Sequence, residues 1–341
     1  MVTRPPGESS PPLCLKFSPI GIDSTFWLLA RSADCAFRST LKDRMELLWG
    51  IDLGGTKIEC VVSAAENILA PVARVRAPTE AQFGYDRVLH NTASLVEKVS
   101  SQLGTKPTRL GISCCGTVKP SDGSMKNCNA TCLNGRPFRS DLEKLLGIEA
   151  VFANDANCFA LAEARLGAGR GANVVFGVIL GSGVGGGVVV NSEVLNGSNG
   201  IAGEWGHNVL EEDGPKCYCG KSGCVERIIS GPALEAYYES LAGEKLPLKE
   251  IENQIDQGNP AALKTFERLI WGLGKSLAVV INILDPDVIV LGGGVSKISR
   301  IYEAVGAEVA KHVFSDEIET RIVQHQLGDS AGVFGALMLV G

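Results

Sequence analysis

The sequence predicts an α/β protein made of two similar lobes with a cleft between them. Three observations support this class: short apolar runs end at glycines, amphipathic segments alternate with them, and the whole order repeats once along the chain. At 341 residues, of which 45% are hydrophobic, the chain is long enough for two domains of ordinary size. A cleft between such domains is a preferred ligand site.

The first half, residues 46–153, is predicted to form a small α/β lobe. Residues 47–53 are a short apolar run that ends at a Gly pair, which indicates a buried strand. The elements predicted after it are strands at 57–63 and 68–76 in an antiparallel meander, a helix at 85–103, and strands at 110–113 and 150–153.

The second half, residues 154–330, is predicted to repeat this theme as a larger lobe. Residues 155–166 are rich in Ala and Leu, which favours a helix. The elements predicted after it are strands at 174–180 and 186–190 around a Gly-rich turn, helices at 232–241, 261–283 and 298–313, strands at 287–291 and 321–325, and a helix at 331–339. We expect residues 331–341 to pack back on the first lobe.

Residues 1–44 differ from the rest, because they are rich in Pro, Ser and Arg and show neither a capped helix nor strand alternation. An organelle-targeting segment would be rich in Arg and Ser but poor in acids. Four acidic residues spoil that pattern. The favoured interpretation is therefore an upstream extension that does not fold, with Met45 as the true start.

Composition argues against two classes of partner. The net charge is −6, whereas nucleic acid and anionic membranes attract clustered Lys and Arg. No apolar run approaches the roughly 20 residues that span a bilayer.

The 11 Cys do not form the pattern of a disulfide scaffold, and several lie in apolar stretches where reduced thiols pack well. We expect a cytoplasmic protein without a nucleic-acid or membrane partner.

Three Gly-rich turns stand where strands meet turns or helices, and each would let backbone N–H groups approach an anion. One alone is weak evidence, since hairpins also use Gly, and the turns show neither the P-loop nor the dinucleotide-binding pattern. Three in two matching lobes favour a nucleotide phosphate site. The candidate residues are Asp52, Gly54, Gly55, Thr56 and Lys57 in the first turn, Gly181, Ser182 and Gly183 in the second, and Gly292, Gly293 and Gly294 in the third.

Asp155 lies where a strand gives way to a helix, at the predicted junction of the lobes. A carboxylate there can cap the helix. It can also act as a general base, accepting a proton from a substrate hydroxyl as that oxygen attacks a phosphoryl group. Asp52 ends the first strand and could hold Mg²⁺ directly or through water, or could be a simple turn acid.

A candidate metal set lies in residues 207–224. Its members are one His and three closely spaced Cys: His207, Cys217, Cys219 and Cys224. Four N and S ligands on a short loop suit tetrahedral Zn²⁺, and a closed four-ligand site is structural rather than catalytic. The alternative is three free thiols near an unrelated His. Glu204 and Glu226 belong to the same loop, so a metal that stiffens it would also fix groups that grip a polar ligand.

Together these motifs resemble the ROK family of sugar kinases and repressors, from residue 46 to residue 341. The resemblance rests on residues 50–57, 154–157, 181–187 and 203–207, and on the Cys knuckle followed by Glu226 and Ser230-Gly231. It implies the duplicated α/β fold shared by actin and hexokinase, a ribonuclease H-like ATPase fold. Residues 129–138, 217–221 and 282–294 look most like the bacterial fructokinase, or manno(fructo)kinase, branch.

The resemblance implies phosphorylation of a hexose at its 6-hydroxyl by ATP with Mg²⁺, most specifically of D-fructose to fructose 6-phosphate. Asp155 would be the base, the first two Gly turns would hold the ATP phosphates, and the third would face the nucleoside. The implied sugar ligands are Asn129, Asn154, Asp155, Glu204, His207 and Glu226. His207 would also ligate structural Zn²⁺. Family members usually form homodimers, which implies a homodimer here.

Two positions depart from the family pattern. Ser182 stands where Thr is usual, which keeps the hydroxyl. Cys132 stands where an aromatic residue is expected in the sugar-side loop, and this bears on which sugar is preferred. A kinase of glucose, mannose or an N-acetylhexosamine is therefore the alternative within the same class.

Two alternatives belong to other classes. A sugar-sensing ROK repressor would carry an N-terminal helix-turn-helix module, and no recognition helix can be placed in residues 1–44. A catalytic zinc hydrolase would need an open coordination position, and four protein ligands leave none.

Overall fold

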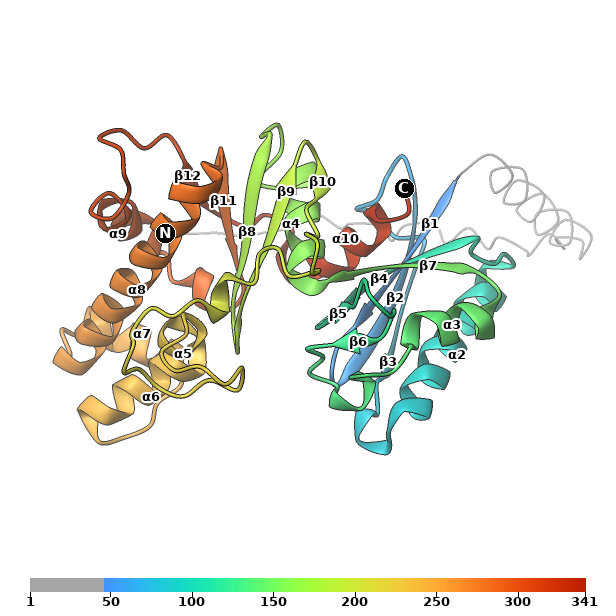
Figure 1. The fold of residues 1–341 in the computed structure, drawn as a ribbon, viewed down its shortest axis with the longest axis horizontal. Coiled ribbons are helices and arrows are strands. Elements are labelled where there is room, and N and C mark those ends of the chain that lie inside the picture. Colours follow the sequence, from blue (N-terminus) through green and yellow to red (C-terminus); the bar gives the residue numbers. More distant parts are fainter. Residues whose placement is uncertain (1–45) are drawn as a thin grey trace, which may run out of the picture. The chain divides into compact units, whose positions relative to one another are not determined.

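The computed structural model describes residues 46–341, and the predictions made for residues 1–44 lie outside the described residues. Within the described range the strands form two five-stranded sheets, one after the other along the chain, and a two-stranded hairpin (Figure 1). No helix between residues 46 and 341 is both long enough and apolar enough to cross a membrane.

The first sheet has the order β3-β2-β1-β4-β7, in which β1, β2 and β3 are antiparallel and β4 and β7 run parallel to β1. Its strands are β1 (Leu47–Leu53), β2 (Lys57–Ala64), β3 (Ala73–Pro78), β4 (Arg109–Cys114) and β7 (Glu149–Asn154). Successive side chains of β1 point to opposite faces. Trp49 and Ile51 belong to one apolar core with the helices α2 and α3, whereas Gly50 contacts Leu337 of α10.

The helices of this half are α2 (Tyr85–Leu103) and α3 (Phe138–Leu146), and the short elements are η1 (Ala81–Phe83), β5 (Thr117–Val118), β6 (Met125–Lys126) and η2 (Thr131–Leu133). The β5-β6 hairpin and η2 lie between β4 and α3. They carry residues 115–134, which include the candidate ligand Asn129.

The second sheet has the order β10-β9-β8-β11-β12, with β8, β11 and β12 parallel. Its strands are β8 (Val174–Leu180), β9 (Val184–Val190), β10 (Glu193–Val194), β11 (Val288–Gly292) and β12 (Arg321–Gln324). One core joins Phe176 and Val178 to the helices that follow β10, with Leu273 of α8 and Ile301 of α9 among its members. A second core joins Val175 and other residues of the opposite face to α4 and α10.

The remaining elements are α4 (Asp155–Leu166), η3 (Trp205–His207), α5 (Glu226–Ile229), α6 (Gly231–Ala242), α7 (Leu248–Asp256), α8 (Pro260–Leu284), η4 (Val295–Lys297), α9 (Arg300–Val309), η5 (Gly328–Ser330) and α10 (Ala331–Met338). Helix α8 begins at a good cap, because the Asn259 side chain accepts hydrogen bonds from two backbone N–H groups and Pro260 follows.

Helices α4 and α10 pack against each other between the two sheets (Figure 1). Helix α10 covers β1 and β4, and α4 covers β8 and β9. The crossing is close: a Cβ added to Gly335 would lie 1.9 Å from the Cys158 carbonyl oxygen. The C-terminal helix thus returns to the first sheet, and the helix that begins with Asp155 lies against the second.

Most predicted elements are present, and two of them differ in length. The strand expected at 68–76 is β3, which begins only at Ala73, because residues 65–72 form turns closed by the Asn67 N–H bond to Ala64. The helix expected at 298–313 is shorter, since η4 precedes α9 and the chain leaves α9 in a tight turn at Lys311. Helices α3, α5 and α7 were not predicted. The division into lobes at residues 153 and 154 stays a prediction.

Candidate active site

Three candidate segments follow neighbouring parallel strands of the first sheet. Leu53 lies opposite Cys114, and Cys114 lies opposite Asn154, so β1, β4 and β7 end at the same level. The first Gly turn follows β1, Cys115 follows β4, and Asp155 follows β7. Ligands of open α/β sheets bind at the carboxyl ends of the strands. The topology therefore brings the first turn and Asp155 to one edge of the sheet.

Asp155 is the first residue of α4, and Asn154 caps the helix. The Asn154 Oδ1 accepts a hydrogen bond from the Ala156 N–H at 2.8 Å, and Asp155 Oδ1 accepts from the same group at 2.8 Å. Burial raises the pKa of the Asp155 carboxyl to about 6. The charges of the Asp52 and Glu204 carboxylates raise this pKa too, whereas the hydrogen bond from the Ala156 N–H lowers it. The charge of Asp52 thus acts on Asp155 from the first sheet, and that of Glu204 acts on it from the loop before η3.

The first turn is held by its own backbone and by Thr79. The Gly54 N–H donates to the Lys57 carbonyl at 3.0 Å, and the Thr79 hydroxyl donates to the Gly54 carbonyl at 2.6 Å. A Cβ added at Gly55 would meet nothing within 4 Å, so the tip of the turn is open. Gly55, Thr56 and Lys57 are exposed there, as an anion site requires.

Asp52 precedes this turn and is mostly buried. Its Oδ1 accepts a hydrogen bond from the Ser113 hydroxyl at 3.1 Å. Burial raises the pKa of the Asp52 carboxyl, while the Ser113 bond acts in the opposite direction. Ser113 lies opposite Asp52 on the neighbouring parallel strand, a pairing that sequence reasoning did not identify.

The second and third Gly turns lie side by side, because β8 and β11 are adjacent and parallel. Gly293 has φ of +85°, and a Cβ there would lie 2.3 Å from the Leu180 carbonyl oxygen, so only glycine lets the turns approach this closely. The third turn was expected at the N-terminus of an α-helix. It instead leads into the short η4, and α9 begins only at Arg300.

Glu226 joins the second Gly turn to the loop of residues 207–224, called here the Cys-rich loop. It is the first residue of α5, and its Oε2 accepts a hydrogen bond from the Val184 N–H at 3.0 Å. The bond spans 42 residues of sequence and was not predictable from local pattern. A carboxylate implied to bind sugar thus also braces the turn implied to hold phosphate.

Glu204 is placed by a close approach of two glycines. Gly203 has φ of +91°, and a Cβ there would lie 2.4 Å from the Gly186 carbonyl oxygen. The following residue, Trp205, is buried and its indole N–H donates to the Gly185 carbonyl at 3.0 Å. These contacts fasten the loop that carries Glu204 onto β9.

Asn129 and Asn134 lie in the loop after the β5-β6 hairpin. The Asn129 N–H donates to the Cys115 carbonyl at 3.3 Å, which brings Asn129 to the strand ends beside Asp155. The Asn134 side chain instead bonds both the N–H and the carbonyl of Cys128, at 2.8 and 3.2 Å. Asn134 therefore braces its own loop.

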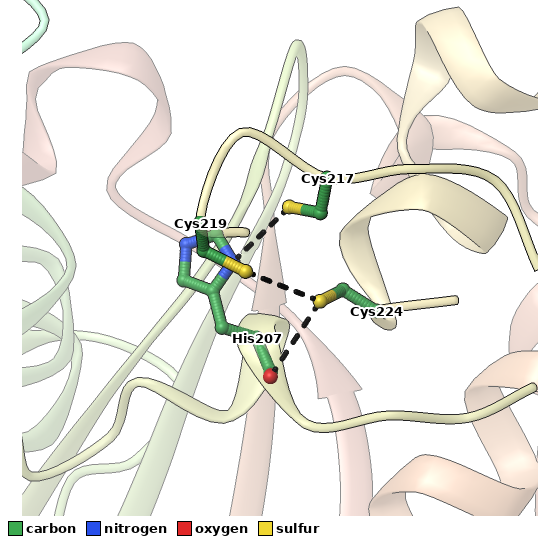
Figure 2. Close-up of side chains that lie close together, drawn as sticks. All are labelled: His207, Cys217, Cys219 and Cys224. Carbon is green, nitrogen blue, oxygen red and sulfur yellow. Dashed lines mark hydrogen bonds between the residues drawn. The ribbon is translucent and has the colours of Figure 1, made fainter. Parts of the chain in front are cut away.

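The four predicted metal ligands come together. Figure 2 shows the imidazole and the three sulfurs around one centre, and the four ligand atoms all lie within 4.8 Å of one another. His207 Nδ1 is 3.6 Å from Cys217 Sγ, and the sulfurs of Cys219 and Cys224 are 3.5 Å apart. In a tetrahedral site with Zn–S bonds of about 2.3 Å, ligand atoms are roughly 3.5–3.8 Å apart. The set fits Zn²⁺.

His207 presents its other ring nitrogen to Tyr218. Nε2 lies 3.0 Å from the Tyr218 hydroxyl, and the two rings meet edge to face. Sequence reasoning did not single out Tyr218, although its place between two Cys ligands was a signal that it belongs to the site.

A cavity of about 560 Å³ borders the loop of Glu204 and His207. Besides these two residues its lining includes the polar Asn127 and Lys221, from separate loops, and the apolar Ile201 and Ile283. Polar and apolar surface therefore lie next to each other on this side of the site.

Comparison with known proteins gives a consistent result. The model of the ROK family matches residues 48–341. The N-acetylgalactosamine kinase AgaK of Shewanella sp. (strain ANA-3) is 35% identical over 301 residues, which cover 86% of this chain and 96% of that one. An N-acetyl-D-glucosamine kinase of Pectobacterium atrosepticum is 37% identical over 303 residues, covering 86% and 98%.

A solved structure shares the architecture. The ROK hexokinase of Thermus thermophilus superposes with a TM-score of 0.77 at 30% identity, covering 86% of this chain and 97% of that one. The predicted fold class, the duplicated α/β fold of the actin and hexokinase type, is thereby confirmed.

Proposed function

The chain belongs to the ROK family, and we propose that it is an ATP-dependent sugar kinase whose preferred substrate is an N-acetylhexosamine. The observation that carries the proposal is the position of Asp155. Its carboxyl lies at the carboxyl edge of the first sheet, and its pKa is raised by burial and further by the charges of Asp52 on the phosphate side and Glu204 on the sugar side. A base between a phosphate site and a sugar site is what phosphoryl transfer to a hydroxyl requires.

The fructose assignment made from residues 129–138, 217–221 and 282–294 is not supported. The similar curated proteins are named as kinases of N-acetylgalactosamine and N-acetylglucosamine, which favours the alternative within the same class. Residues 282–294 run from the end of α8 through β11 to the third Gly turn, so that segment carries none of the candidate sugar ligands.

The sugar side offers carboxylate, amide and imidazole groups to hydroxyls. We assign it the ligands Asn129, Asn154, Asp155, Glu204, His207 and Glu226. An acetamido group adds an apolar methyl, and the cavity beside Glu204 and His207 has apolar lining from Ile201 and Ile283. Binding sites of this kind combine apolar walls with a few fixed polar groups.

The reaction follows from the placement of Asp155. The sugar 6-hydroxyl donates its proton to the Asp155 carboxylate as its oxygen forms a bond to the γ-phosphorus of ATP, and the bond from that phosphorus to the bridging oxygen breaks. With a pKa near 6 the carboxylate is ionised at neutral pH yet basic enough to accept a proton. Burial of the carboxyl is therefore part of the proposed chemistry.

The phosphate side consists of the Gly turns. The open tip of the first turn, with Thr56 and Lys57, and the adjacent second and third turns offer backbone N–H groups, a hydroxyl and a positive charge. Asp52 supplies a carboxylate for Mg²⁺, which would neutralise phosphate charge. A single carboxylate suffices because Mg²⁺ takes its other ligands from water and phosphates.

We assign His207, Cys217, Cys219 and Cys224 to a structural Zn²⁺. The donor set is closed, so its role is to fix the loop that runs from Glu204 to Glu226. Trp205 and Val225, next to the two carboxylates, are buried in the core of the second sheet, and the metal would fix the residues 207–224 that lie between them.

Substrate preference is tested by initial rates with MgATP over N-acetylglucosamine, N-acetylgalactosamine, fructose, glucose and mannose. One N-acetylhexosamine should exceed every other class of sugar in kcat/KM by about tenfold or more, since a site built to bond a group rejects analogues without it. Fructose as the best substrate would contradict the assignment.

A further inference from the structure

A loop that follows the second sheet's strand β10 contacts the β5-β6 hairpin, which follows β4 of the first sheet. The loop comprises residues 195–203. The amine of Lys126 in β6 donates a hydrogen bond to the Asn199 carbonyl at 2.8 Å, across 73 residues of sequence. Next to this bond, a Cβ added at Gly200 would lie 3.3 Å from the Thr117 hydroxyl oxygen of β5. The hairpin and the 195–203 loop therefore lie directly against each other.

The contact uses both strands of the hairpin. Thr117 and Lys126 are opposite each other in the β5-β6 pairing, so one lies against Gly200 while the other bonds Asn199. Gly200 has φ of +64° and is half-buried, whereas its two neighbours in sequence are exposed. Glycine takes this backbone conformation without strain and leaves room for the hairpin. The hairpin thus covers the loop at this one point.

The 195–203 loop passes this contact on to Glu204, because its own backbone hydrogen bonds close it into tight turns. The Gly200 N–H donates to the Gly197 carbonyl at 3.1 Å. The Glu204 N–H donates to the Ile201 carbonyl at 3.2 Å. Each bond closes a turn and restricts the backbone within it. The place where the loop meets the hairpin therefore limits where the backbone of Glu204 can lie.

On the hairpin side, Lys126 is followed by the loop that carries Asn129. Asn127 has φ of +58° and turns the chain out of β6. Asn127 also lines the cavity of about 560 Å³ that Ile201 and Glu204 border from the other side of the contact. The bond from Lys126 therefore links the two segments that lead to the assigned sugar ligands Asn129 and Glu204.

We propose that Lys126 is a positioning residue for the sugar: its bond to the 195–203 loop fixes Glu204 relative to Asn129 and so sets the affinity for the sugar. This rests on the proposed function, in which both side chains bind sugar hydroxyls. Holding two loops in place before the ligand arrives reduces the conformational entropy that is lost on binding. The proposal applies to every sugar that the site accepts, since it concerns the spacing of the ligands.

Two other roles for Lys126 make different predictions. If its bond only stabilised the fold, Lys126→Met would lower the unfolding temperature and leave sugar affinity unchanged. If its amine bonded the sugar directly, loss of the amine and displacement of the 195–203 loop would be independent changes, and their effects on affinity would multiply. If Lys126 acts through the loop, the second change adds little to the first.

The test uses the full chain and three single variants. Lys126→Met keeps the apolar stem and loses the donor, Lys126→Arg keeps a donor, and Gly200→Ala crowds the hairpin. The Lys126→Met/Gly200→Ala double variant completes the cycle. The control Lys311→Met removes another exposed lysine bond, 2.6 Å to Glu308. The control Gly258→Ala places a side chain at a similar φ of +72° with nothing within 4 Å.

The probe is the sugar of the five-sugar panel that the wild type phosphorylates best. Its Kd is measured by calorimetry without ATP, and kcat, both KM values and the unfolding temperature are measured beside it. We expect Lys126→Met and Gly200→Ala each to raise the Kd and the KM for the sugar about 5-fold. The double variant should lie within about 2-fold of the weaker single variant, because both changes act on one contact.

The remaining variants should separate positioning from a general loss of stability. Lys126→Arg and both controls should keep the wild-type Kd, and the KM for MgATP should change less than about 2-fold in every variant, since the phosphate side is untouched. An unchanged Kd in Lys126→Met, or losses that multiply in the double variant, would overturn the role of Lys126 and leave the proposed function standing. A wild type that phosphorylates none of the five sugars would overturn both.

Discussion

At the residue scale, the surroundings of Asp155 decide what its carboxylate can do. The sequence predicted its place at a strand–helix junction. The alternative role of helix cap belongs to Asn154, whose side chain accepts the hydrogen bond from the Ala156 N–H. Burial raises its pKa, and two further carboxylates act on it from different segments. Those long-range neighbours, like the Val184 bond to Glu226, depend on the tertiary fold. A local pattern could name the residue but could not give its pKa.

The pH dependence of kcat/KM tests this environment. Raising the pKa from its ordinary value near 3.8 to about 6 means that the carboxylate is ionised and active above pH 6 and protonated and inactive below it. The rate should therefore fall about tenfold per pH unit as the pH drops below about 6.

The control for this profile is Asp122→Asn, which removes an exposed carboxylate whose pKa is lowered by its bonds to Ser124. That variant should keep the acidic limb of the wild type. A wild-type rate that stays flat down to about pH 4.5 would show that Asp155 is not a buried base.

At the scale of elements, the α4–α10 crossing positions the site. Helix α4 starts at Asp155, and α10 packs on β1 and β4, the strands that end at Leu53 and Cys114. The sequence predicted both helices and the return of the C-terminus to the first sheet. It did not predict α3 and α7, which follow Pro137 and Pro247 in loops that local pattern left unassigned.

Two glycine variants measure how tight this crossing is. A Cβ at Gly335 would lie 1.9 Å from the Cys158 carbonyl oxygen, so Gly335→Ala must push α4 and α10 apart and should destabilise by about 1–3 kcal/mol. Gly306 lies within α9 with open space around it, and Gly306→Ala should stabilise by about 0.5–1 kcal/mol. Denaturant unfolding compares the two.

Opposite signs for these variants are the expected result, and Gly335→Ala should also slow turnover because α4 carries Asp155. If Gly335→Ala were as stable as the wild type, the close packing of the two helices would be wrong.

At the scale of the whole molecule, the carboxyl ends of the parallel strands in each of the two sheets, together with the Cys-rich loop, supply the parts of the site. Residues far apart in sequence, such as Asp52, Asn129 and Asp155, meet because β1, β4 and β7 end together. Motif spacing predicted the fold class, the Cys and His cluster and the acid. The preferred sugar could not be predicted, since the assigned sugar ligands Asn129, Glu204 and Glu226 come from separate segments, and a local pattern does not give how those segments pack.

Metal removal tests the role of the Cys-rich loop. Cys219→Ser should lose bound zinc, lower the unfolding temperature by on the order of 5 °C or more, and weaken sugar binding, because the loop from Glu204 to Glu226 loses its anchor. Cys132→Ser, which removes a half-buried thiol outside the cluster, should keep its zinc. A folded, zinc-free Cys219→Ser that binds sugar as tightly as the wild type would refute the structural role.

The most direct test of the central claim is the rate of sugar 6-phosphate formation from MgATP and N-acetylglucosamine by the wild type and by Asp155→Asn. The substitution keeps the size of the side chain and removes its basicity. We expect kcat to fall by about 100-fold or more, while sugar binding measured by calorimetry changes only a few-fold. An Asp155→Asn protein that forms the 6-phosphate at close to the wild-type rate would contradict the account.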